Sequence, residues 1–139
     1  MDANRWGWAL AIVTVLGCGD GDASRAGAGR RSIDSNGGTY TVSFESTPDP
    51  IPMNGLFDVR FTVAPKAAGA KTDDLQVQVD ARMPAHFHGM NRAPKLTRQA
   101  DGSFKAEGLL FHMPGHWELS FDVSQGGRTE RAQADVELK

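Results

Sequence analysis

From Thr39 onward the chain alternates apolar and polar residues with a period of two, and this pattern limits the fold more than any other feature. In residues 40–45, 57–63 and 75–83 every second side chain is apolar. A period of two sends successive side chains to opposite faces of a β-strand, so each strand has one face to bury. No stretch of this part of the chain has the period of an amphipathic helix. We therefore predict an all-β domain.

Four further strands complete the predicted domain. They are expected at residues 95–99, 103–111, 117–123 and 132–138. Asp101-Gly102 predicts a hairpin turn, and Gly108 predicts a bulge within its strand. Short strands separated by turn residues are typical of an antiparallel β-sandwich. We predict an immunoglobulin-like sandwich of about seven strands over residues 39–139.

The first eighteen residues have the composition of an export signal. Arg5 supplies a positive charge, residues 6–16 are mostly apolar, and Gly17 precedes Cys18, the only cysteine. This order resembles a bacterial lipobox, which predicts that residues 1–18 are a lipoprotein signal peptide and that Cys18 carries the lipid. An ordinary cleaved signal peptide and an uncleaved anchor are the alternatives.

Residues 19–38 consist mainly of Gly, Ala, Ser, Asp and Arg, and Ile33 is almost the only apolar residue among them. This composition predicts a flexible tether between the anchor and the domain. The predicted location is the periplasmic or cell-surface face of a bacterial membrane, where the N-terminal anchor contacts membrane lipid.

Charge and motifs argue against two large classes of function. The formal net charge of -2 and the pI of about 6.0 provide no basic surface for nucleic acid. The sequence has no Gly-x-Ser-x-Gly elbow, no phosphate-binding loop and no carboxylate pair spaced for general acid and base catalysis. Asp and Glu fall at strand positions that we expect to face outward. We predict neither an enzyme nor a nucleic-acid partner.

All four histidines lie in two short segments that also contain methionine. These segments are Met83-Pro84-Ala85-His86-Phe87-His88-Gly89-Met90 and His112-Met113-Pro114-Gly115-His116. Consecutive antiparallel strands alternate in direction, so the loop after 75–83 and the turn after 103–111 should lie at the same end of the sandwich. We therefore expect the two segments to meet in space.

The donor atoms of these segments favour copper. Imidazole nitrogen suits several transition metals, whereas thioether sulfur is soft and favours Cu(I). The candidate nitrogen donors are His86, His88, His112 and His116, and the candidate sulfur donors are Met90 and Met113. A zinc site built from the four histidines is an alternative that the pattern does not demand. The expected cofactor is copper, and the expected partner is a copper-receiving or membrane protein.

The same residues also have structural interpretations. Met83 continues the inward alternation of its strand and is favoured as a core residue. Met113-Pro114-Gly115 followed by Trp117 is typical of a tight turn that directs a large aromatic side chain into the core. His86 and His88 could be exposed loop residues or a pH sensor. On this interpretation the domain is a protein-interaction module without metal.

The histidine segments resemble the YtkA-like domain family. The resemblance rests on both segments, on Asp101-Gly102-Ser103-Phe104, on Gly108-Leu109, and above all on Met113-Pro114-Gly115-His116-Trp117. It covers roughly residues 40–123 and implies a small exported β-sandwich, often lipid-anchored. It also implies a relation to the periplasmic part of FixH-like proteins, which are associated with oxidase assembly and copper handling. The His-x10-Met spacing of the better-known periplasmic copper chaperones is absent, so those proteins imply no ligand set here.

Overall fold

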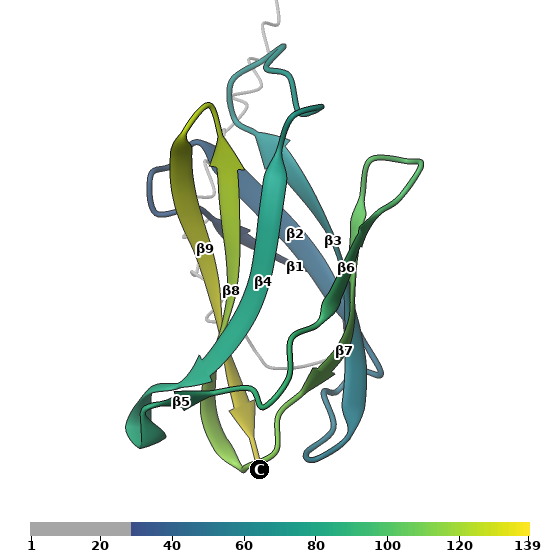
Figure 1. The fold of residues 1–139 in the computed structure, drawn as a ribbon, viewed down its shortest axis with the longest axis vertical. Helices are drawn as coiled ribbons and strands as arrows, with labels where there is room; N and C mark the ends of the chain where they lie inside the picture. The colour runs from purple at the N-terminus through teal and green to yellow at the C-terminus, as the bar shows by residue number, and fades with distance from the viewer. Residues whose placement is uncertain (1–28) are drawn as a thin grey trace, which may run out of the picture.

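Two antiparallel sheets face each other in the computed structural model, which describes residues 29–139 (Figure 1). The strand order is β1-β2-β3-β7-β6 in the first sheet and β5-β4-β8-β9 in the second. The strands are β1 (Arg31–Asp34), β2 (Tyr40–Thr47), β3 (Leu56–Pro65), β4 (Gln76–Met83), β5 (His88–Gly89), β6 (Lys95–Arg98), β7 (Phe104–Leu110), β8 (Gly115–Gln125) and β9 (Arg128–Leu138). A single turn of 3₁₀ helix, η1 (Pro84–His86), joins β4 to β5. The predicted all-β sandwich is confirmed, with more strands than the seven expected.

The arrangement of strands is that of an immunoglobulin-like domain. The runs β2-β3-β7-β6 and β4-β8-β9 follow the A-B-E-D and C-F-G order of that fold, and every pairing between neighbours is antiparallel. Strand β1 extends the first sheet beside β2, and β5 extends the second beside β4. Within residues 29–139, no helix is long and apolar enough to cross a membrane.

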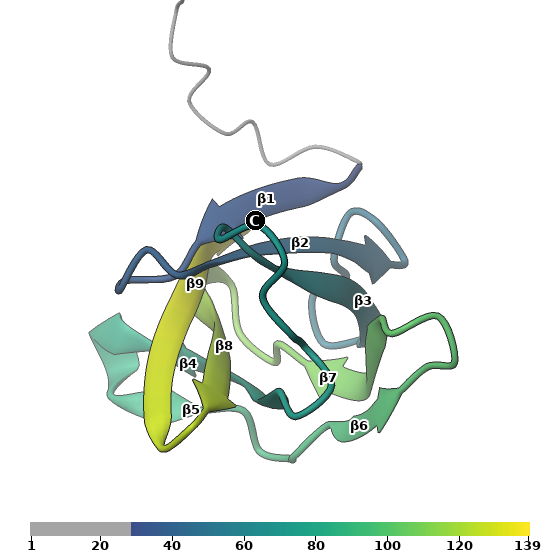
Figure 2. The same cartoon turned by 90° about the horizontal axis from the view of Figure 1, so that it is seen from above.

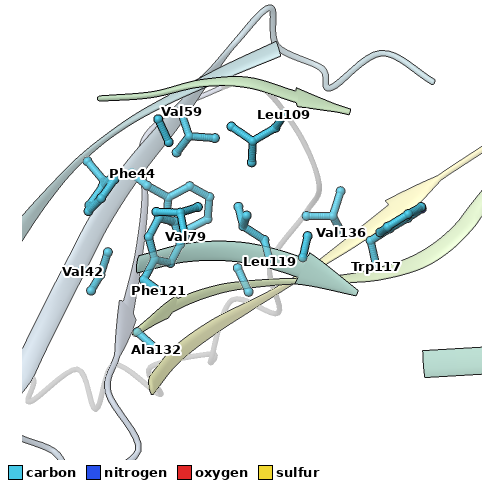
Figure 3. Packing of buried hydrophobic residues seen from close by; sticks show 14 of the residues in the cluster. Val42, Phe44, Val59, Val79, Leu109, Trp117, Leu119, Phe121, Ala132 and Val136 are labelled. Atoms are coloured by element: carbon cyan, nitrogen blue, oxygen red, sulfur yellow. The ribbon is translucent and has the colours of Figure 1, made fainter. Parts of the chain in front are cut away.

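The core lies between the sheets and is built from the inward positions of the alternation (Figure 3). Strand β2 buries every second residue from Tyr40 to Ser46. Phe44 and Phe121 meet across the two sheets with their ring centroids 5.2 Å apart. The largest fully buried side chains include Trp117, Phe44, Phe57, Phe61, Phe111 and Phe121. Because the described residues contain no cysteine, burial of these apolar groups takes the place of a disulfide in stabilising the domain.

Strand β1 shows that the tether predicted for residues 19–38 is wrong over its last part. All four residues of β1 pair with β2, and the hydroxyls of Ser32 and Ser43 are hydrogen-bonded at 2.7 Å. Backbone pairing at a sheet edge needs few apolar side chains, so composition gave no indication of this strand. The ordered domain therefore begins before Thr39. Residues 1–28, which include the predicted signal peptide and Cys18, lie outside the described residues.

The β1–β2 hairpin also joins the first sheet to the second (Figure 2). Ser35 forms a bridge with Ala132 of β9. The Asn36 amide donates to the Arg131 carbonyl at 2.8 Å, and the Arg131 amide donates to the Asn36 side-chain oxygen at 3.0 Å. The hairpin thus closes one side of the sandwich, at the end opposite to the loop between β4 and β5.

Glu130 is buried beneath this hairpin. Its carboxylate accepts hydrogen bonds from the Ser35 hydroxyl at 2.6 Å and from the Thr39 hydroxyl and amide at 2.5 and 3.1 Å. These donors, Ser35 first, hold the pKa of Glu130 below its usual range. The expectation that acidic residues face outward is therefore wrong for Glu130, which occupies the inward phase of β9.

Candidate metal site

The loop after β4 and the turn between β7 and β8 lie at the same end of the sandwich, which we term the histidine end (Figure 1). The rings of His88 and His112 are 5.1 Å apart between centroids and inclined by 29°. The rings of His86 and His88 are 5.8 Å apart. The two segments therefore meet, as the alternating strand directions predict, and bring three of the four histidines together. We term these three residues the histidine cluster.

Trp117 fixes the position of this cluster from the core side. Its ring is fully buried and stacks on Phe111, with centroids 4.6 Å apart and planes inclined by 3°. His88 and His112 meet the indole edge-on, at 5.9 and 5.5 Å. The indole nitrogen donates to the Met113 carbonyl at 3.0 Å and so closes the β7–β8 turn. The predicted structural role of the Met-Pro-Gly-x-Trp turn is confirmed.

His88 and His112 each have a ring nitrogen that is available to bind a metal ion. Nδ1 of His88 is 3.1 Å from the Gly89 carbonyl oxygen, and a neutral ring that donates its Nδ1–H to this carbonyl leaves the lone pair on Nε2. Metal-binding histidines commonly donate their second ring N–H to a carbonyl or carboxylate in this way. Nδ1 of His112 is buried and has no hydrogen-bond partner within the described chain. Such an atom is unfavourable by about 1–3 kcal/mol, and a bound ion would satisfy it.

The spacing of the rings fits one ion held between two imidazoles. At a metal–nitrogen bond of about 2.0 Å, two rings on one ion have centroids roughly 4.5–6.3 Å apart. The separations of 5.1 Å for His88–His112 and 5.8 Å for His86–His88 fall within this range. The nitrogen atoms of all three rings do not lie within 4.8 Å of one another. The arrangement is therefore a pair with a third histidine beside it.

His116 lies apart from the histidine cluster, so the four histidines do not form one site. It directly precedes the buried Trp117 on β8, and the period of two therefore sends its side chain to the outer face of the sheet. The His116 side chain is 45% exposed and lies 3.5 Å from Asp135 and 3.8 Å from Glu137 of β9. The sequence predicted four histidine donors at one site. The structure groups three of them in the histidine cluster and turns His116 outward.

The surroundings of His116 form a second, more polar group. Among residues 29–139, His116, Glu118 and Asp135 are the only three His, Cys, Asp or Glu residues with ligand atoms all within 4.8 Å of one another. Glu118 is also paired with Arg82, whose Nε lies 2.6 Å from the carboxylate. The charge of Glu118 is thus already balanced by a guanidinium group, which weakens this group as a cation site.

The methionines contribute to packing at the histidine end. Met83 is buried, and its terminal methyl would lie 2.8 Å from a side-chain carbon added at Gly115, so its predicted core role is confirmed. Met90 and Met113 are partly buried and pack against the core. The thioethers of Met90 and Met113 remain candidate sulfur donors, because these residues are close in sequence to the cluster.

A surface groove of about 470 Å³ runs beside His88. Its lining is Asp80, Arg82, Met83, Pro84, Phe87, His88 and Gly89. Phe87 is 97% exposed and has a φ of 55°, a left-handed conformation that is unfavourable for a bulky residue. The exposure of Phe87 was not predicted from the sequence. Its position between two loop histidines, outside any strand, was the signal that could have indicated it.

The fold and these loops define an immunoglobulin-like β-sandwich with a cluster of histidines at one end. The chain belongs to the YtkA-like family, whose sequence model matches residues 34–122. The crystal structure of a DUF4426 family protein from Pseudomonas aeruginosa PAO1 has a similar fold, with a TM-score of 0.53 and 9% sequence identity. That similarity covers 79% of this chain and 94% of the other, and at this identity it concerns the fold alone. No curated protein matches the chain.

Proposed function

We propose that the protein binds copper at the histidine end, through His88 and His112, and handles the metal as an exported, lipid-anchored protein. His86 and the thioether of Met90 or Met113 are the further donors. One observation carries the proposal: the ring of His112, whose Nδ1 is buried and unpartnered, lies beside the ring of His88, whose Nδ1 is already engaged with the Gly89 carbonyl. Imidazole together with thioether is a donor set that favours Cu(I).

The surroundings of the pair support binding rather than catalysis. Trp117 and Phe111 hold both imidazoles against a rigid base, so little side-chain freedom is lost when an ion binds. The implied relation to FixH-like proteins, which are associated with oxidase assembly, favours transfer of copper to a partner at the membrane.

A titration of the full chain in detergent with Cu(I), in competition with a chelator, tests the proposal. We expect His88→Ala and His112→Ala each to lower the affinity at least tenfold. His116→Ala is the matched control, because it removes an imidazole from the outer face of the same end, and it should leave the affinity unchanged.

Two results would contradict this assignment. If His116→Ala lowers the affinity and His88→Ala does not, the ion is held by the carboxylate-rich group on β8 and β9. If the wild-type chain does not compete with the chelator, the domain is the alternative, a protein-interaction module whose Met-Pro-Gly-x-Trp turn only builds the fold.

The proposed anchor has its own test. We propose that Cys18 carries the lipid, because it is the only cysteine and follows the apolar run of residues 6–16. Cells fed a radiolabelled fatty acid should incorporate it into the wild-type chain and not into Cys18→Ala. Equal labelling of the two chains would rule out Cys18 as the lipidation site.

A further inference from the structure

The exposed large apolar side chains of the described residues all belong to the histidine end. They are Met53, Leu56 and Phe87, which are 51%, 56% and 97% exposed. Leu56 pairs with Leu110 at the last position of β7, two residues before His112. The loop that carries Met53 and the η1–β5 segment that carries Phe87 lie on opposite sides of this end (Figure 1). The apolar groups therefore frame the histidine cluster.

The chain enters the domain at the same end. The Gly29 amide donates to the Asp49 carboxylate at 2.6 Å, and Asp49 belongs to the loop between β2 and β3, two residues after β2 ends. The proposed lipid-bearing Cys18 is thus joined to this end by residues 19–28. Ten residues span at most about 36 Å when fully extended, so a lipid on Cys18 keeps the histidine end near the bilayer.

We propose that the histidine end docks on the surface of a lipid bilayer, with Phe87, Leu56 and Met53 reaching into the interfacial layer. A flat occupant suits three apolar side chains that stand on two segments at opposite sides of a rim, Met53 and Leu56 before and at the start of β3 and Phe87 between η1 and β5. Aromatic and large aliphatic side chains partition favourably into the membrane interface. The joining of the proposed lipid anchor to this same end selects the bilayer over a soluble partner. This inference rests on the proposed lipid anchor and does not depend on metal binding.

Tryptophan reporters in the full chain test the docking. The lipid-anchored chain that begins at Cys18 keeps only the buried Trp117, which supplies a constant background, and Trp6→Phe with Trp8→Phe in the parent removes any signal from unprocessed chain. Into this parent we would introduce Phe87→Trp, Leu56→Trp or Ala68→Trp. Ala68 is the matched control, since it is exposed in the loop between β3 and β4 at the opposite end. Each chain is reconstituted into vesicles of phosphatidylethanolamine and phosphatidylglycerol with brominated acyl chains, which quench nearby tryptophan fluorescence.

We expect quenching above the parent background at positions 87 and 56, and none above it at position 68. Equal quenching at 87 and 68, or none at 87, would overturn the proposal. A second variant separates docking from simple tethering. In the Leu56→Trp chain, Phe87→Asp should reduce the quenching toward the parent, whereas unchanged quenching would show that the anchor alone sets the distance and that the end does not dock. Because the vesicles contain no copper, failure here is distinguishable from failure of the metal proposal.

Discussion

The two ends of the sandwich differ in whether their buried ionisable side chains have hydrogen-bond partners. At the end closed by the β1–β2 hairpin, Glu130 is buried and its carboxylate receives hydrogen bonds from Ser35 and Thr39. At the histidine end, Nδ1 of His112 is buried without a partner, and Phe87 is fully exposed in a left-handed conformation. Satisfied buried groups stabilise a fold, whereas unsatisfied and strained groups are more typical of functional sites.

The largest expected change in stability comes from Trp117, the buried aromatic residue beneath the histidine cluster. Replacing Trp117 with Ala removes a fully buried indole and should lower the free energy of unfolding by about 3–5 kcal/mol. Phe87→Ala changes an aromatic residue at the same end that is 97% exposed, and should stay within about 0.5 kcal/mol of wild type. Urea denaturation measures both. Similar losses would mean that Phe87 packs on the domain in solution.

A smaller effect is expected at the turn that separates His112 from His116. Gly115 has a φ of 113°, and an added Cβ would lie 2.8 Å from the buried Met83 methyl group. Gly115→Ala should therefore lower the unfolding free energy by roughly 1–3 kcal/mol. Gly102, in the β6–β7 turn at the other end, has a φ of 81°, and an added Cβ there would contact no other atom. Gly102→Ala should therefore lower the unfolding free energy by only about 1 kcal/mol. Equal losses, measured by thermal unfolding, would show that Met83 gives way freely.

At the hairpin end, the prediction concerns how the stability of the domain changes at low pH. The folded pKa of Glu130 is lowered, first by the Ser35 hydroxyl, so its contribution is present above the unfolded pKa of the carboxyl group and is lost as the pH falls through the folded pKa. Glu130→Gln should be less stable than wild type at neutral pH and should lose less stability in acid. The exposed Glu45→Gln is the control and should retain the wild-type profile. Parallel profiles for Glu130→Gln and wild type would contradict this role.

The smallest effect is expected at His112. There the comparison between the two ends predicts that a substitution does not lower the free energy of unfolding, in contrast to Glu130→Gln. Because Nδ1 lacks a partner, His112→Leu removes an unsatisfied group and should leave the unfolding free energy unchanged or raise it by up to about 1 kcal/mol. Cu(I) affinity should fall in the same variant. A clear loss of stability would indicate that His112 is satisfied in solution and serves the fold.

The sequence was sufficient to predict most strands, because the period of two survives wherever one face of a strand is buried. It was insufficient for β1 and β5. Strand β1 is held at an edge by backbone pairing, by the contact of Ser32 with Ser43 and by Ile33 alone against the core, and one apolar residue makes no visible period. Strand β5 is two residues long, too short for any period to be visible.

The candidate site was predictable in its location and only partly in its membership. Alternating strand directions were enough to bring His88 and His112 to one end. The outward direction of His116 was also present in the sequence, since Trp117 next to it had to face inward. The burial of Glu130 was not readable in this way, because its hydrogen-bond donors lie more than 90 residues earlier in the chain.

The β1–β2 hairpin also determines how the sandwich resists self-association. Strand β1 covers the edge of β2, and the hairpin reaches across to β9 through Ser35 and Ala132. Exposed strand edges recruit the edges of other molecules and so favour aggregation. A chain shortened to begin at Thr39, where the alternation starts, would uncover both strands at once and should aggregate. A chain that begins at Gly29 keeps β2 paired with β1 and keeps the contacts of the hairpin with Arg131 and Ala132, so in light scattering it should stay monodisperse.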